Sequence, residues 1–255
     1  MNLRFKVAYE GTRYSGWQRQ GNTGNTIQAK LTEVLSRYFG IEVEIHASGR
    51  TDAGVHAAGQ VFNVKLKEAD PSRLSRYLKE LNAYLPEDIR LLEITEAGPR
   101  FHSRLNSRWK TYRYLIYTGV SDPFDRRLSF FWEEALAVTP MQKAASLLTG
   151  THDYLGFSSV KPGKRSTVRT VYEIAIDVSA PHPGQQRMEL TFSGDGFLYH
   201  MVRYLAGTLI EAGQGRRSPE SVKELLLSKD KDAASFLAPP EGLCLMDVHY
   251  EPWPE

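Results

Sequence analysis

The chain has 255 residues, enough for one large domain or for two domains of about 125 residues that each bury a core. Hydrophobic residues make up 41% and charged residues 24%, which excludes a disordered or collagen-like chain. Lysine and arginine number 32 against 30 aspartate and glutamate, so the net charge of +2 indicates no particular class of partner.

The sequence contains no apolar run of the roughly 18 residues that a membrane span needs. Its first nine residues alternate charged and apolar side chains and lack the apolar core of a signal peptide. Cys244 is the one cysteine, so no internal disulfide can form, and its apolar neighbours indicate core packing. We therefore expect a cytoplasmic protein without a membrane segment.

The first half of the chain shows alternating strand and helix patterns. Apolar alternation predicts a strand over Leu3–Tyr9, and helical spacing between Thr26 and Gly40 as caps predicts a helix. The remaining predicted elements are strands over 41–45 and 61–66, a helix over 70–81 and a strand over 89–95. The order β-α-β-β-α-β is the ferredoxin-like arrangement, an antiparallel sheet with helices on one face.

The second half repeats this order of elements. The predicted elements are strands over 109–118, 168–178, 187–193 and 245–250, and helices over 140–148, from Phe197 and over 219–227 behind Ser218. No repeat is visible at the level of residues, so the duplication rests on element order alone. We expect an α+β fold with antiparallel or mixed sheets in two ferredoxin-like halves, 1–106 and 107–255.

A basic segment, Gly98–Val120, joins the two halves. It holds five cations and no acidic residue, namely Arg100, Arg104, Arg108, Lys110 and Arg113. Aromatic residues lie between and after them, namely Phe101, Trp109, Tyr112, Tyr114 and Tyr117. Such a segment can hold phosphates and stack bases, although a strand with a solvated basic face fits the composition equally well.

Asp52 lies in a loop between two predicted strands, with Gly49, Gly54 and Gly59 around it. Glycines allow positive φ and close backbone approach, so we expect a tight exposed loop, in which an aspartate usually caps a turn. His46, Asp52 and His56 could also be a metal group, but their spacing matches no common zinc motif and no fourth ligand is evident. His56 is instead expected to bond the loop backbone.

The nine residues from Gly49 to Ala57 resemble the active-site signature of the tRNA pseudouridine synthase A family. Further stretches resemble the same family in order along almost the whole chain: Tyr9–Thr12, Gly16–Gln18, Thr26–Gln28, Phe101–Arg104, Lys110–Tyr114, Gly150–Asp153, Gly196–Arg203 and Ala238–Leu243. Tyr154 stands where the family has a phenylalanine, a departure that bears only on packing.

The resemblance implies that uridine is isomerised to pseudouridine in the anticodon stem-loop of tRNA, around positions 38 to 40. The base leaves C1′, turns, and is rejoined through C5. The family also implies a homodimer that contacts one tRNA with both subunits, and two ferredoxin-like halves forming a central RNA-binding cleft, the pseudouridine synthase fold. The reaction needs no redox group, nucleotide or metal, and the sequence has neither a P-loop nor a dinucleotide fingerprint, so no cofactor is expected.

The resemblance also assigns residue roles. Asp52 is the catalytic carboxylate, which must be ionised whether it adds to C6 or acts at C1′. Arg203 pairs with Asp52 and lowers the pKa of that carboxyl. Tyr112 lies against the target base, a choice over Tyr114 that only the resemblance makes. The role of Arg50 follows from its place beside Asp52: we expect it to fill the gap left by the flipped nucleotide, as base-modifying enzymes require, or otherwise to contact a phosphate.

Leu243 is a further substrate-binding candidate by resemblance. The candidate contacts to the RNA backbone are Arg100, Arg104, Arg108 and Lys110. Helical spacing puts Arg203 on one face with His200 and Gly207, away from the apolar stripe, so that it can reach another loop.

Two other functions compete with this one. A non-catalytic RNA-binding module would use two similar ferredoxin-like halves, but the Lys/Arg-Gly-Phe-Gly-Phe string typical of such modules is missing. A metal-dependent hydrolase would use His46, Asp52 and His56, and a chelator would abolish its activity.

Overall fold

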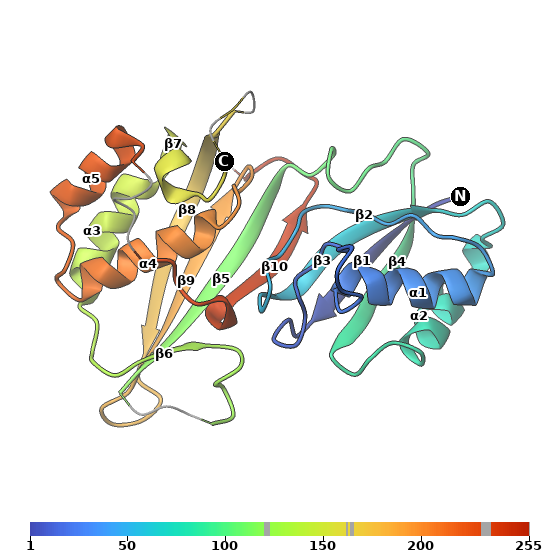
Figure 1. Cartoon of the computed structure of the whole chain (residues 1–255), viewed down its shortest axis with the longest axis horizontal. Helices are drawn as coiled ribbons and strands as arrows, with labels where there is room; N and C mark the ends of the chain where they lie inside the picture. The colour runs from blue at the N-terminus through green and yellow to red at the C-terminus, as the bar shows by residue number, and fades with distance from the viewer. Residues whose placement is uncertain (120–122, 162, 164–165, 231–235, 255) are drawn as a thin grey trace. The chain divides into compact units, whose positions relative to one another are not determined.

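The computed structural model describes residues 1–119, 123–161, 163, 166–230 and 236–254 (Figure 1). The chain divides into unit 1, Met1–Arg108 with Cys244–Glu255, and unit 2, Trp109–Leu243. The expected halves were 1–106 and 107–255, whereas the last strand, which begins the segment Cys244–Glu255, belongs to unit 1. The reason is that this strand pairs in parallel with β3, Cys244 opposite His56 and Leu245 opposite Ala57.

Unit 1 contains the ferredoxin-like arrangement that its sequence predicts. Its elements are β1 (Asn2–Tyr9), α1 (Ile27–Phe39), β2 (His46–Ala47), β3 (His56–Lys65), the 3₁₀ turn η1 (Pro71–Arg73), α2 (Leu74–Asn82), β4 (Ile89–Ala97) and, apart from its first residue, β10 (Leu243–His249). β1 lies between β4 and β3 and is antiparallel to both, and β2 pairs with the far edge of β3. The expected α+β class is confirmed.

The alternation in β1 separates the two faces of this sheet. Leu3, Phe5 and Val7 are completely buried, whereas Arg4 and Lys6 between them are only half-buried. Figure 1 shows α1 and α2 side by side against these strands. The core of unit 1 therefore lies between the helices and the Leu3–Val7 face, and the Arg4–Lys6 face lies on the side away from the helices.

Unit 2 repeats this order of strands. Its elements are β5 (Trp109–Thr118), β6 (Phe130–Trp132), α3 (Val138–Leu148), β7 (Gly150–Asp153), η2 (Leu155–Phe157), β8 (Val168–Ser179), β9 (Gln186–Gly194), α4 (Met201–Gly213), α5 (Pro219–Ser228) and η3 (Pro240–Gly242). β9 pairs with β5 on one side and β8 on the other, and β7 pairs with β8. The long strands of unit 2 are β5, β8 and β9 in chain order. The third of them, β9, thus lies between β5 and β8, as β3 lies between β1 and β2 in unit 1.

The structure differs from the predicted elements at four places. Residues 41–45 form no strand, because Val43 and Ile45 are buried as packing groups while the Val43 N–H bonds the Ser36 hydroxyl at 3.0 Å. β3 begins at His56 instead of residue 61. α4 begins at Met201, because His200 adopts a left-handed φ of 65° that interrupts the helix expected from Phe197. The short strands β6 and β7 have no alternation long enough to predict them.

None of the described helices combines the length and the apolar character that a membrane span requires.

Candidate active site

The Asp52 loop, residues Ser48–Val55, connects β2 to β3 and is fixed at its base by β3. The Ser48 N–H donates to the Val61 carbonyl at 2.8 Å, and the Ser48 hydroxyl donates to Oε1 of Gln60 at 2.6 Å. Gln60 is fully buried and donates from Nε2 to the Gly49 carbonyl at 3.2 Å. The start of the loop is therefore held by a buried amide, while Asp52 itself is half-buried.

The long connection Gly11–Asn25, here called the Trp17 loop, holds the Asp52 loop from its other side. The Trp17 N–H donates to the Thr51 carbonyl at 3.0 Å, and the Gly54 N–H donates to the Tyr14 carbonyl at 3.3 Å. Trp17 itself is buried at 1% exposure. Asp52 thus lies between two residues, Thr51 and Gly54, whose backbones are both bonded to the Trp17 loop.

Two glycines allow the backbones of these loops to approach closely. A Cβ atom on Gly11 would lie 1.9 Å from the Val55 carbonyl oxygen, a distance that real Cβ atoms never show. A Cβ on Gly16 would lie 2.8 Å from the Thr51 carbonyl oxygen, and Gly16 has a φ of 88°, which favours glycine. The close packing of the two loops therefore depends on both glycines.

Asp88, the residue before β4, secures the Trp17 loop. Its carboxylate accepts hydrogen bonds of 2.6 Å from the Tyr14 hydroxyl and from Nη2 of Arg13. Burial and the bond to Asp88 raise the pKa of Tyr14 far above its ordinary value, so the hydroxyl stays a donor. Burial opposes ionisation of Asp88, but the hydrogen bonds from Tyr14 and Arg13 outweigh it and lower its pKa. Sequence reasoning missed this network, because no motif links Asp88 to Tyr14.

Two histidines of the candidate metal group, His46 and His56, have partners that the structure shows. His56 is buried, and its Nδ1 accepts the Gly11 N–H at 2.9 Å. The expected bond to backbone is confirmed, although the backbone is that of the Trp17 loop. The His46 ring lies 5.0 Å from the ring of His102. The described part of the chain contains no group of three or more His, Cys, Asp or Glu side chains that could hold a metal ion.

Tyr112 and Tyr114 both lie on the buried face of β5, in unit 2. The Tyr112 ring meets the Phe197 ring edge to face at 5.3 Å. Tyr114 is fully buried and donates from its hydroxyl to the Pro239 carbonyl at 2.9 Å, and burial raises its pKa well above the ordinary value. Both rings are therefore packed within unit 2, and the choice of Tyr112 over Tyr114 as a site residue rests on the resemblance.

Arg203 lies on α4 and bonds a segment that follows α5. Its Nε donates to the Ala238 carbonyl at 2.7 Å, and the Ala238 N–H donates to the Arg203 carbonyl at 3.2 Å. One turn further along, a Cβ on Gly207 would lie 1.9 Å from the Phe236 carbonyl oxygen. The helix face that carries Arg203 and Gly207 is therefore covered by 236–238, a contact that helical spacing alone could not show.

The other candidates divide between the units. Arg50 is exposed on the Asp52 loop in unit 1, whereas Leu243 is buried at the last position of unit 2. Lys110 is half-buried on β5, also in unit 2.

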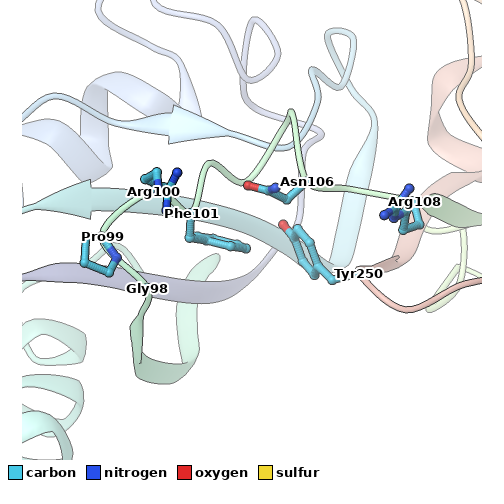
Figure 2. Close-up of a pocket in the computed structure, with 7 residues that line it drawn as sticks. All are labelled: Gly98, Pro99, Arg100, Phe101, Asn106, Arg108 and Tyr250. Atoms are coloured by element: carbon cyan, nitrogen blue, oxygen red, sulfur yellow. The ribbon is translucent and has the colours of Figure 1, made fainter.

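Arg100, Arg104 and Arg108 are exposed in the connection between β4 and β5, so the alternative of a basic strand face does not describe them. No carboxylate of the described residues forms an ion pair with these three arginines. Two of them, Arg100 and Arg108, line a shallow pocket of about 460 Å³ (Figure 2). The basic segment therefore offers exposed cations to a polyanion.

Comparison with known proteins identifies the family. A family model described as tRNA pseudouridine synthase matches residues 6–105 and 144–251. The tRNA pseudouridine synthase A of Bacillus sp. (strain KSM-64) is 45% identical over 251 residues, covering 98% of this chain and 99% of the relative. The protein of the same name from Geobacillus kaustophilus (strain HTA426) is 42% identical over 257 residues, covering 98% and 96%.

A chain in the crystal structure of a Cbf5-Nop10-Gar1 complex aligns with 82% of this chain and 45% of its own length. Its sequence identity of 12% and TM-score of 0.34 are too low to bear on fold or function. The family model and the near full-length relatives agree with each other, and both agree with the motif around Asp52. This chain therefore belongs to the tRNA pseudouridine synthase family and is a pseudouridine synthase, an isomerase.

Proposed function

We propose that this enzyme isomerises uridines at positions around 38, 39 and 40 in the anticodon stem-loop of tRNA, with Asp52 as the catalytic carboxylate. The observation that carries the proposal is the Asp52 loop, a family-like motif held by β3 on one side and by the Trp17 loop on the other. A loop fixed in this way presents its carboxylate in one geometry, which is what positioning catalysis requires.

The bond changes define what the carboxylate must do. The N1–C1′ bond of uridine breaks, a C5–C1′ bond forms, the C5 proton leaves and N1 gains a proton, so the reaction involves no net oxidation. Asp52 would add to C6 of the uracil or act at C1′, and either route requires an ionised carboxylate. Neither route requires a cofactor.

The remaining roles follow the family resemblance. We infer that Arg203 supplies a cation for Asp52, that Tyr112 and Leu243 bind the target base, and that Arg50 fills the space left by the flipped nucleotide. The RNA backbone would be held by cations of the basic segment, namely Arg100, Arg104, Arg108 and Lys110.

Release of tritium from tRNA labelled at C5 of uridine tests the activity, since the C5 proton leaves in each turnover. Chemical mapping of pseudouridine in tRNA from cells lacking this protein tests the positions. We expect unmodified uridine at positions 38 to 40 in those cells and normal pseudouridine elsewhere. Unchanged modification at these positions would contradict the proposed substrate.

Replacing Arg203 tests its proposed pairing with Asp52. Arg203→Ala removes the cation, so the pKa of the Asp52 carboxyl should rise and the fraction ionised at neutral pH should fall. Because a raised carboxyl pKa is compensated at higher pH, the rate should fall sharply near pH 7 and recover in part as the pH is raised. Arg203→Lys keeps the charge but loses the planar guanidinium, so its rate should lie between those of wild type and Arg203→Ala.

The pH–rate profile under single-turnover conditions is the measurement for this prediction. Since the Ala238 carbonyl also bonds Arg203, thermal unfolding must show that the variant is folded. A folded Arg203→Ala variant with wild-type rate at every pH would remove Arg203 from the active site.

We further propose that the protein is a homodimer, as the family resemblance implies. Sedimentation velocity should give the mass of two chains, each calculated as 28.9 kDa, across the micromolar range. A single-chain mass that does not change with concentration would contradict this proposal.

A further inference from the structure

The basic segment and the last residues of unit 1 together form the pocket shown in Figure 2. Its lining consists of Gly98, Pro99, Arg100, Phe101, Asn106, Arg108 and Tyr250. The Arg4 guanidinium lies 6.0 Å from the centre of the Tyr250 ring. Because Arg4 belongs to the β1 face away from the helices, the pocket lies on that face of the unit 1 sheet.

Buried amides hold the wall of the pocket in place. Asn2, 4% exposed, donates from Nδ2 to the carbonyls of Gly98 at 3.0 Å and of Phe101 at 2.8 Å. Asn63, 1% exposed, donates to Oδ1 of Asn2 at 3.0 Å and accepts the Ser103 N–H at 2.9 Å. The connection after β4 is therefore fixed to the sheet by two buried side chains, so the pocket is preformed.

The other wall is fixed to the same connection. The Tyr250 hydroxyl donates to the Ser103 carbonyl at 3.0 Å, and the Arg108 N–H donates to the His249 carbonyl at 2.8 Å. The rings of Phe101 and Tyr250 consequently lie 5.1 Å apart, inclined at 56°.

The side chains in this pocket have the chemistry of a nucleotide site. Figure 2 shows Arg100 and Arg108 at opposite ends, with the two rings and Asn106 between them. Aromatic rings stack on bases of any kind, and guanidinium groups bind phosphates. Oδ1 of Asn106 accepts the His102 N–H at 2.8 Å, which leaves the amide nitrogen of this side chain to donate to the edge of a base.

We propose that this pocket binds an unpaired nucleotide of the tRNA, with its base on the Phe101–Tyr250 ring pair and its flanking phosphates on Arg100 and Arg108. The inference rests on the proposed function, which makes tRNA the ligand. Cys244 pairs with His56, close to the Asp52 loop, and Tyr250 lies six residues further along the chain, roughly 20 Å away. One nucleotide cannot occupy both places, so the pocket is a second anchoring point.

Substitutions of Phe101 separate stacking from simple packing. Phe101→Leu keeps apolar bulk but removes the aromatic face, and it should weaken tRNA binding about tenfold. Phe101→Tyr keeps the ring and should bind like wild type. Because the pocket lies away from Asp52, the rate at saturating tRNA should stay near wild type while KM rises. Equal binding by wild type and a folded Phe101→Leu variant would overturn the stacking contact.

Substitutions of Arg108 test the phosphate contact. Arg108→Gln should weaken tRNA binding and reduce the slope of log Kd against log salt by about 0.9 at most, the value for one duplex phosphate. Arg37→Gln is the matched control, since Arg37 is an exposed arginine in the last turn of α1, on the helix side of the same sheet. A slope unchanged in Arg108→Gln, or changed equally in Arg37→Gln, would overturn the phosphate contact.

These outcomes can be told apart from failure of the proposed function. The function fails if wild-type enzyme releases no tritium from labelled tRNA. The proposed nucleotide binding in the pocket is wrong if the wild-type enzyme is active and the variants Phe101→Leu and Arg108→Gln both have the KM and Kd of the wild type. Loss of maximal rate with unchanged KM in folded variants would also overturn the inference, because it would place these residues in the chemical step.

Discussion

Asp52→Asn is expected to abolish pseudouridine formation, with a fall in rate of more than about 10⁴-fold, while tRNA affinity stays within a few fold. The amide has nearly the same shape as the carboxylate, and so it preserves the loop. It has no negative charge, so it can neither add to C6 nor stabilise C1′ as an anion. Tritium release from C5-labelled tRNA measures the rate, and filter binding measures the affinity.

Asp177→Asn provides the matched control, since Asp177 is an exposed carboxylate on β8. That variant should match wild type in both measurements. If the Asp52→Asn enzyme kept its rate, the catalytic role of this carboxylate would be wrong, and the family motif would have to act through another residue.

Gly11→Ala is expected to lower the rate by about 10²-fold with little change in tRNA affinity. The added Cβ would lie 1.9 Å from the Val55 carbonyl oxygen, far inside the 3.4 Å at which ordinary contact begins. The Asp52 loop would therefore have to move by about 1 Å or more, and a displacement of that size in a catalytic group costs roughly two orders of magnitude. Single-turnover rates at saturating enzyme measure this effect.

Gly24→Ala is the matched control for that substitution. Gly24 lies in the same Trp17 loop, but nothing lies within 4 Å of the Cβ it would gain. Its rate and thermal unfolding should stay near wild type. Equal rates in the two variants would show that close packing at Gly11 does not position Asp52.

Local patterns predicted the elements whose signals are complete within a few residues. The Thr26 hydroxyl accepts the Ala29 N–H at 3.2 Å and Gly40 has a φ of 68°, so the two caps of α1 lie where the sequence places them. Residues 41–45 show the limit of such reasoning. Alternation reports that Val43 and Ile45 are buried, but it cannot report whether a neighbouring strand is available to bond their backbone.

The residues of the site were predictable to the extent that one motif contains them. The string from Gly49 to Ala57 identifies Asp52, and glycines within it predict a tight loop. Two of the groups that fix this loop, Tyr14 and Asp88, lie 38 and 36 positions from Asp52 in the sequence and belong to no motif around it. Only the fold brings them together, because side-chain to backbone bonds leave no periodic pattern in the sequence.

The pairing of β10 with β3 has a consequence for how the protein is made. His56 and Cys244 pair with each other, yet nearly two hundred residues separate them in the chain. At about 5 to 20 residues per second, a ribosome needs roughly ten seconds or more to make the second partner after the first. During that time the nascent N-terminal unit has an unpaired strand edge immediately after the Asp52 loop, which favours association with other chains. A product that terminates before residue 244 therefore lacks this strand, and only a chain extended past Leu245 can complete the sheet beside its own Asp52 loop.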